Sequence, residues 1–263
     1  MVPFIDLVNH SSKANVQYDQ DEETKGVILK LRAGKVIEKG EELFINYGAD
    51  KSASEMLFSY GFVEKTTLFE FLIGHIPNSV KFPAVVPNQD VKLESWGRRF
   101  GTPMLEIKGK KGQLEIESPF VYLLMLDQKD GLEMDDVVRP EDPTFHDIRA
   151  IWQGQDITDH LDNIEVILRN HPQKELFDIR VMFIYHALIN HQMEMMQAAE
   201  DLEAQFDTDE MPADQKRIHK SASELRAIES TTLDSAMDIV QDWVSSEKAQ
   251  EWWQSRQAAN RQE

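Results

Sequence analysis

The chain has 263 residues, 41% of them hydrophobic, so it can bury the core of one large domain or two modest ones. Its formal net charge of −19 disfavours direct binding to DNA, RNA or anionic membranes and permits a basic protein partner. The alternative is that the acidic charge only keeps the protein soluble. The absence of cysteine excludes disulfides and thiolate metal sites, and no apolar run or leader pattern predicts a membrane span or a secretory signal. We therefore expect an intracellular, soluble protein of the cytoplasm and/or nucleus.

The first part of the chain, residues 1–75, predicts short strands, turns and one helix. Strand-like runs occupy 27–31, 43–47 and 68–73, and Gly or charged turns separate them. Ser52 and Glu55 have the spacing of a capping box, in which each side chain bonds the backbone of the other, and Gly61 suits a left-handed helix end. This pattern predicts a helix after Ser52 that stops at Gly61.

The rest of the chain changes from mixed to helical. Residues 76–117 are punctuated by prolines and are interpreted as a connecting region. From Ser118-Pro119 onward we expect a helical region, 118–263, with helices near 120–124, 157–169 and 173–206 and a long amphipathic helix after Pro212. The predicted fold class is α+β, with a small β-rich part followed by a mainly helical one.

Three motifs in the first part resemble one family when they are taken together. They are Asn9-His10-Ser11 after an apolar stretch that includes Asp6, Phe44-Ile45-Asn46-Tyr47-Gly48 after Gly40-Glu41, and the segment from Lys51-Ser52 to Tyr60-Gly61-Phe62. Each motif alone is weak, but their order and spacing are similar to the second half of a SET domain. More specifically, they resemble the SET subclass of Rubisco large-subunit lysine methyltransferase. In this subclass a helical substrate-binding domain follows the SET domain. Residues 118–263 resemble that domain by their position and helicity alone.

The resemblance implies a protein-lysine N-methyltransferase that uses S-adenosyl-L-methionine as its cofactor. It assigns catalysis to Tyr47 and cofactor binding to Asn9 and His10. It assigns substrate binding to Tyr60 and, with less support, to Asp6. It also implies a protein substrate, for which the acidic charge favours a basic ribosomal or nuclear protein. Relatives that methylate a protein histidine leave histidine as an alternative target.

The chemistry of this reaction needs such residues. Methyl transfer to lysine is an in-line displacement by a neutral amine, whose ordinary pKa is about 10.4. A dry channel with aromatic walls favours the uncharged amine, and aromatic faces and oxygen atoms accommodate the positive methyl donor. A tyrosine at the end of a strand supplies both a wall and a hydroxyl, which is the role expected of Tyr47.

Structural interpretations of the same residues stand beside the functional ones. Asn9-His10 could form a local turn, Tyr47 could be a half-buried strand residue, and Tyr60 could pack at a helix end. Tyr18 is a further aromatic candidate, but the loop after His10 does not align with the family and Tyr18 is not assigned. No histidine spacing predicts a metal site. We expect Trp252-Trp253 to dock onto the helical part.

The sequence also departs from the family. A SET domain begins with a Gly-rich strand and turn that form the other wall of the cofactor site, and the chain begins almost at Asn9-His10. We therefore expect the cofactor pocket of this chain to be open on one side. A partial sequence, a decayed paralogue, or a protein that keeps only the helical half as a non-enzymatic binding module would each account for this pattern.

Overall fold

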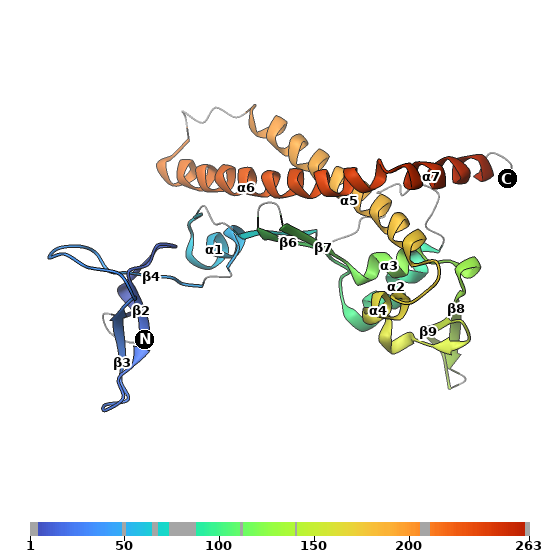
Figure 1. Ribbon diagram of the computed structural model, residues 1–263, viewed down its shortest axis with the longest axis horizontal. Helices are drawn as coiled ribbons and strands as arrows, with labels where there is room; N and C mark the ends of the chain where they lie inside the picture. The colour runs from blue at the N-terminus through green and yellow to red at the C-terminus, as the bar shows by residue number, and fades with distance from the viewer. Residues whose placement is uncertain are drawn as a thin grey trace.

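The computed structural model describes residues 5–48, 51–64, 68–73, 88–110, 113–139, 141–205 and 211–260. It has the α+β class that the sequence predicts. The N-terminal strands lie at one end of the molecule and helices α2 to α4 with the β8–β9 hairpin lie at the other. Helix α6 runs along most of the length between them (Figure 1).

The N-terminal strands form two separate pairs. Strand β1 (Asn9–His10), which follows the short 3-10 helix η1 (Ile5–Leu7), pairs in parallel with β4 (Phe44–Ile45). Strands β2 (Val16–Gln20) and β3 (Val27–Leu31) form an antiparallel hairpin. The strand predicted at 27–31 is confirmed, whereas the one predicted at 43–47 is only two residues long.

Helix α1 (Ala53–Tyr60) begins and ends where the sequence predicts. The Ser52 hydroxyl accepts a hydrogen bond from the Glu55 N–H at 3.2 Å, and Gly61 takes a φ of 78° while its N–H donates to the Leu57 carbonyl. The other half of the predicted capping box is wrong. The Glu55 carboxylate pairs with Lys51 instead of the backbone.

A three-stranded antiparallel sheet follows, in the order β5-β6-β7. Its strands are β5 (Leu68–Ile73), β6 (Leu105–Lys110) and β7 (Gln113–Glu117). Helix α2 (Gln89–Phe100) lies between β5 and β6 in the chain and buries Trp96. Residues 88–110 and 113–117 thus contain regular elements that the prediction of a connecting region over 76–117 did not foresee. Residues 76–87 and 111–112 of that region lie outside the described residues.

The segment from 118 to 168 is less helical than the sequence predicts. Helix α3 (Pro119–Met125) begins as expected, and the 3-10 turn η2 (Gln128–Asp130) follows it. A hairpin of β8 (Leu132–Arg139) and β9 (Asp142–Trp152), extended by β10 (Gln155–Asp156), then takes the place of expected helix. The single helix predicted at 157–169 is the 3-10 helix η3 (Thr158–Asn163) and the short α4 (Ile164–Leu168).

Three long helices complete the chain. They are α5 (Lys174–Glu203), α6 (Ala213–Val244) and α7 (Glu247–Asn260). The prediction that Trp252 and Trp253 dock onto the helical part is confirmed, because both rings lie against Phe183, at 5.3 and 5.0 Å between ring centroids. The polar end of the chain is helical through Asn260.

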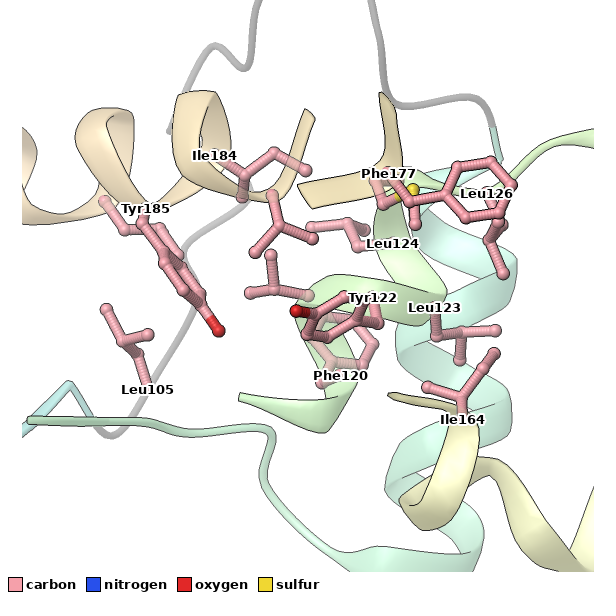
Figure 2. Packing of buried hydrophobic residues seen from close by; sticks show 14 of the residues in the cluster. Leu105, Phe120, Tyr122, Leu123, Leu124, Leu126, Ile164, Phe177, Ile184 and Tyr185 are labelled. Atoms are coloured by element: carbon pink, nitrogen blue, oxygen red, sulfur yellow. The ribbon is translucent and has the colours of Figure 1, made fainter. Parts of the chain in front are cut away.

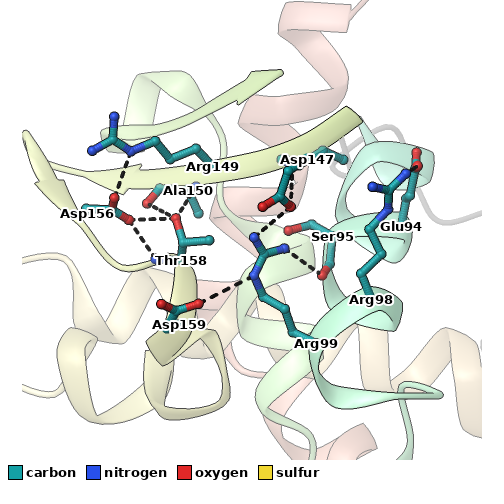
Figure 3. A network of polar contacts seen from close by, with 11 residues as sticks. Glu94, Ser95, Arg98, Arg99, Asp147, Arg149, Ala150, Asp156, Thr158 and Asp159 are labelled. Carbon is teal, nitrogen blue, oxygen red and sulfur yellow. Dashed lines mark hydrogen bonds and ion pairs between the residues drawn. The ribbon is translucent and has the colours of Figure 1, made fainter. Parts of the chain in front are cut away.

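The main core lies where α3 meets α5, α4 and β6 (Figure 2). Helix α3 is buried on every side, from Phe120 to Met125, which explains why its sequence is almost wholly apolar. Polar contacts hold α2 to the edge of this core (Figure 3). Arg99 of α2 donates to Asp147 of β9 at 2.7 Å and lies 3.7 Å from Asp159 of η3.

No helix within the described ranges is both long enough and apolar enough to cross a membrane.

Candidate functional site

The parallel pairing of β1 with β4 brings the first two sequence motifs together. Asn9 is opposite Phe44 and His10 is opposite Ile45, and the Ser11 N–H extends the pairing to the Ile45 carbonyl at 3.0 Å. The buried Asn15 side chain fixes the same strand by accepting from the Phe44 N–H at 2.8 Å. Tyr47, two residues beyond β4, is therefore held close to His10.

The His10 ring is the centre of this contact. Its side chain is 5% exposed, and its Nδ1 accepts a hydrogen bond from the Tyr47 backbone N–H at 3.0 Å. Because Nδ1 accepts, the ring hydrogen of a neutral His10 is on Nε2, which donates to the Glu64 carboxylate. The imidazole thus joins the end of β4 to the segment that follows α1.

Glu64 accepts hydrogen bonds from His10 and from the Ser12 N–H, the latter at 3.0 Å. Partial burial tends to raise the pKa of this carboxyl, but the hydrogen bonds from Ser12 and His10 outweigh it and hold the pKa below its usual value. Glu64 is therefore an ionised acceptor at neutral pH, and it fixes the tautomer of His10.

Tyr47 is held at both ends. Its hydroxyl donates to the Val8 carbonyl at 2.8 Å, and its ring lies 5.0 Å from His10 and 4.6 Å from Tyr60 between centroids. Phe62 extends this aromatic group, at 5.7 Å from His10. The tilted contacts are typical of stabilising aromatic pairs. The structure thus places Tyr47, Tyr60 and His10 in one cluster, which we call the aromatic cluster together with Phe62.

Tyr18 and Asp6 are close enough to this cluster to interact with it electrostatically. Partial burial raises the pKa of Tyr18, the negative charge of Asp6 raises it further, and the phenols of Tyr47 and Tyr60 add to this where they ionise. Tyr18 is 49% exposed and Tyr60 is 43% exposed, so both present ring surface to solvent. Tyr18, which the sequence left unassigned, is thus a neighbour of the predicted site residues.

Asn9 lies at the edge of the site with an exposed side chain. Its Nδ2 donates to the Glu42 carboxylate at 2.6 Å. Among the described residues its Oδ1 accepts no hydrogen bond, so this oxygen is available to a donor from outside the chain.

Sequence reasoning missed three residues that complete the arrangement: Glu42, Phe62 and Glu64. Glu64 lies 54 positions from His10 in the chain, so no local pattern reports their contact. The signal that was present is that Glu42 and Phe62 lie within the second and third motifs, and that Glu64 follows two residues after Phe62.

Comparison with known proteins confirms the resemblance to SET-domain proteins. Residues 2–48 match the SET domain family. SET domain-containing protein 8 of Schizosaccharomyces pombe is 27% identical over 192 residues, which are 72% of this chain and 41% of that protein.

Two plant enzymes match a shorter part of the chain. The ribulose-1,5 bisphosphate carboxylase/oxygenase large subunit N-methyltransferase of Nicotiana tabacum is 32% identical over 75 residues, 26% of this chain and 15% of that protein. The same enzyme of Pisum sativum is 32% identical over 72 residues, 24% of this chain and 14% of that protein. The chain thus spans less than half the length of the curated relatives it matches.

Proposed function

Because residues 2–48 match the SET domain family, we propose that the chain is part of an S-adenosylmethionine-dependent protein-lysine N-methyltransferase. In this proposal Tyr47 is catalytic, Asn9 and His10 bind the cofactor, and Tyr60 and Asp6 contact the substrate lysine. One observation carries it: the β1–β4 pairing joins the two motifs of the matched segment and places Tyr47 against His10.

The residues present fit a cationic, amine-bearing methyl donor. The free Oδ1 of Asn9 can accept from an ammonium group such as that of the methionine moiety, and exposed tyrosine faces nearby favour a sulfonium. When bound, the cofactor would supply an electrophilic methyl group. His10 would act through its backbone, since its ring is already engaged by Tyr47 and Glu64.

The hydrogen bond of Tyr47 suits its proposed role. Its hydroxyl hydrogen is committed to the Val8 carbonyl, so the lone pairs of its oxygen face away from that bond. An oxygen held in this way can accept from a substrate amine and stabilise a nearby positive methyl group without reorganising. Tyr47 thereby aligns the amine, while the rings of Tyr60 and Tyr18 exclude water and favour the neutral lysine.

The partner in this proposal is a basic protein, such as a ribosomal or nuclear protein. The net charge of −19 supports a Lys-rich substrate and opposes direct contact with nucleic acid. We place the protein in the cytoplasm or nucleus, where such substrates occur and where a chain without cysteine needs no oxidising compartment.

Calorimetric titration of the purified chain with S-adenosylmethionine tests the cofactor site. We expect saturable binding that Asn9→Ala weakens about ten-fold, because one charge-assisted hydrogen bond is worth about 1.5 kcal/mol. Asn46→Ala is the matched control, since among the described residues the Asn46 side chain bonds only the Gly48 N–H. Absence of binding in the parent chain would favour the second candidate, a non-enzymatic helical module that binds a basic partner.

Mass spectrometry of a modified substrate distinguishes the target residues. A methyl group on a lysine Nζ supports the proposal, and a methyl group on an imidazole nitrogen supports the alternative of a protein-histidine methyltransferase.

A further inference from the structure

Helix α6 carries a row of acidic side chains along its second half. Asp234, Asp238 and Asp242 are spaced four residues apart, so they lie along one side of the helix, and all three are exposed. Within the parts of the chain that the structure describes, no lysine, arginine or histidine pairs with any of them. We call these three residues the acidic stripe.

An unpaired row of this kind has an energetic cost. Like charges at a spacing of four destabilise a helix by mutual repulsion, whereas some other acidic residues of these helices are paired, as Glu203 is with Arg226 and His219. A partner that brings positive charge to the acidic stripe would remove this repulsion. The stripe therefore has the charge complementary to a basic ligand.

Each end of the acidic stripe opens into a hollow between α5 and α6. Asp242 lines a groove of about 400 Å³ with Trp243, Ile179 and Glu175. Asp234 lines a smaller hollow of about 160 Å³ in which Glu200 supplies a second carboxylate. Both ends of the stripe thus combine a hollow with a pair of acidic residues, one from each helix.

The groove at Asp242 also has an aromatic wall. Trp243 is 45% exposed, although tryptophan is costly to leave in water. The chain's own Lys248 already pairs with Glu175 at the rim of this groove, which shows that a basic side chain reaches that carboxylate. A guanidinium over the indole, with Asp242 beside it, would combine a cation–π contact with an ion pair.

The spacing of the stripe selects a conformation for the ligand. Four helical residues rise by about 6 Å, and alternate residues of an extended peptide are about 6.6 Å apart. We propose that the acidic stripe and the Trp243 groove bind an extended peptide segment with Lys or Arg at alternate positions, the last of them seated beside Trp243. This deepens the proposed function by naming where the basic substrate is held, yet binding here requires neither cofactor nor turnover.

Fluorescence anisotropy with the full chain tests this site without cofactor. The probe is a fluorescein-labelled peptide of sequence Ala-Lys-Ala-Lys-Ala-Arg-Ala, and its control, Ala-Ala-Lys-Lys-Arg-Ala-Ala, has the same composition and charge. We expect the alternating peptide to bind more tightly than the control and to lose affinity at high salt. Equal affinity for the two peptides, or no binding at 50 mM NaCl, would overturn the proposal.

Two charge-matched variants locate the binding surface. Asp234→Asn/Asp238→Asn/Asp242→Asn should raise the Kd about five-fold, and Trp243→Ala about three-fold, as expected for exposed ion pairs and one cation–π contact. Glu22→Gln/Glu23→Gln/Glu38→Gln removes three exposed charges from the N-terminal part and should change the Kd by less than two-fold. Equal weakening by both triple variants would show that only bulk charge matters.

Circular dichroism confirms that the variants are folded, and sedimentation distinguishes another occupant. A dimer in the parent chain that becomes a monomer in the acidic-stripe variant would assign the stripe to a second copy and contradict the peptide proposal. A chain that binds the peptide but not S-adenosylmethionine would retain this inference and refute the proposed function.

Discussion

The backbone N–H of Tyr47 donates a hydrogen bond to Nδ1 of His10 at 3.0 Å. This bond requires Nδ1 to be unprotonated, and the Glu64 carboxylate at Nε2 stabilises that tautomer. A side chain that follows α1 thereby determines how the end of β4 is held. Glu64 acts on the site through His10 and is a positioning residue.

Substitution of Glu64 by Gln should loosen this arrangement. Gln has one acceptor oxygen where Glu64 uses two, so either Ser12 or His10 would face an amide NH₂. We expect the free energy of unfolding to fall by about 1–2 kcal/mol, measured by urea denaturation at pH 7. Glu55→Gln, which breaks only an exposed pair with Lys51, should cost about 0.5 kcal/mol or less.

The same variant has a pH signature. Because the pKa of folded Glu64 lies below its usual value of 4.5, Glu64 contributes stability above pH 4.5 that is lost as the pH falls through its folded pKa. The difference in stability between the parent and Glu64→Gln should therefore shrink below pH 4.5. A difference that stays constant to pH 3 would show that the carboxylate charge has no part in it.

Lys92 gives a second pH-dependent prediction, in the core. Its buried ammonium donates to the carbonyls of Leu124 and Leu126 at the end of α3, and burial lowers its pKa to about 8 although Asp127 and Asp130 oppose this. Between pH 8 and its ordinary value of 10.5, the unfolded chain binds the proton that the folded chain has released, so stability rises with pH.

We expect the free energy of unfolding of the parent chain to rise, relative to that of Lys92→Met, by about 1 kcal/mol per pH unit between pH 8 and 9.5. Lys129→Met, at an exposed position, should keep the parental slope. Identical slopes for the parent and Lys92→Met would contradict a depressed pKa for Lys92. Measurements should stop before pH 10, because burial raises the pKa of Tyr122 and Tyr185 and their ionisation in the unfolded chain then lowers stability.

Trp253 should anchor α7 to α5. Its ring stacks on Phe183 at 5.0 Å with an interplanar angle of 19°. Trp253→Ala should lower the free energy of unfolding by about 2 kcal/mol through lost burial and ring contact. Gln254→Ala, on the exposed side of α7, should change it by less than about 0.5 kcal/mol. Thermal unfolding followed by circular dichroism would measure both, and equal midpoints would mean that α7 is not held by this contact.

Local chemistry explains which elements the sequence predicts well. The Ser52 cap and Gly61 define α1 without any distant contact, and most buried residues of α5 recur at three- and four-residue spacing. The β8–β9 hairpin was missed because charged residues interrupt it, as in Glu133 and Asp135, and because pairing across the hairpin, not local pattern, specifies the strands.

The residues of the candidate site also fall into those that local motifs predict and those that depend on distant contacts. The motifs predicted Asn9, His10 and Tyr47, and the structure shows how one strand pair unites them. The role of Glu64 depends on its contact with His10, 54 positions away in the chain, which a single sequence does not report. Helix α2 was missed for a different reason: its buried residues are only Lys92, Ser95 and Trp96, so its sequence is largely polar.

Transfer of a deuterated methyl group tests the central claim most directly. The purified chain is incubated with S-adenosylmethionine that carries a CD₃ group and with a ribosomal protein extract, and the products are sequenced by mass spectrometry. The proposal predicts CD₃-lysine with the parent chain, at least about 100-fold less with Tyr47→Phe, and parental levels with Tyr122→Phe, which alters a tyrosine outside the site. Equal lysine labelling by the parent and Tyr47→Phe would contradict the catalytic role of Tyr47, and no labelling of any residue by the parent chain would contradict the enzymatic proposal itself.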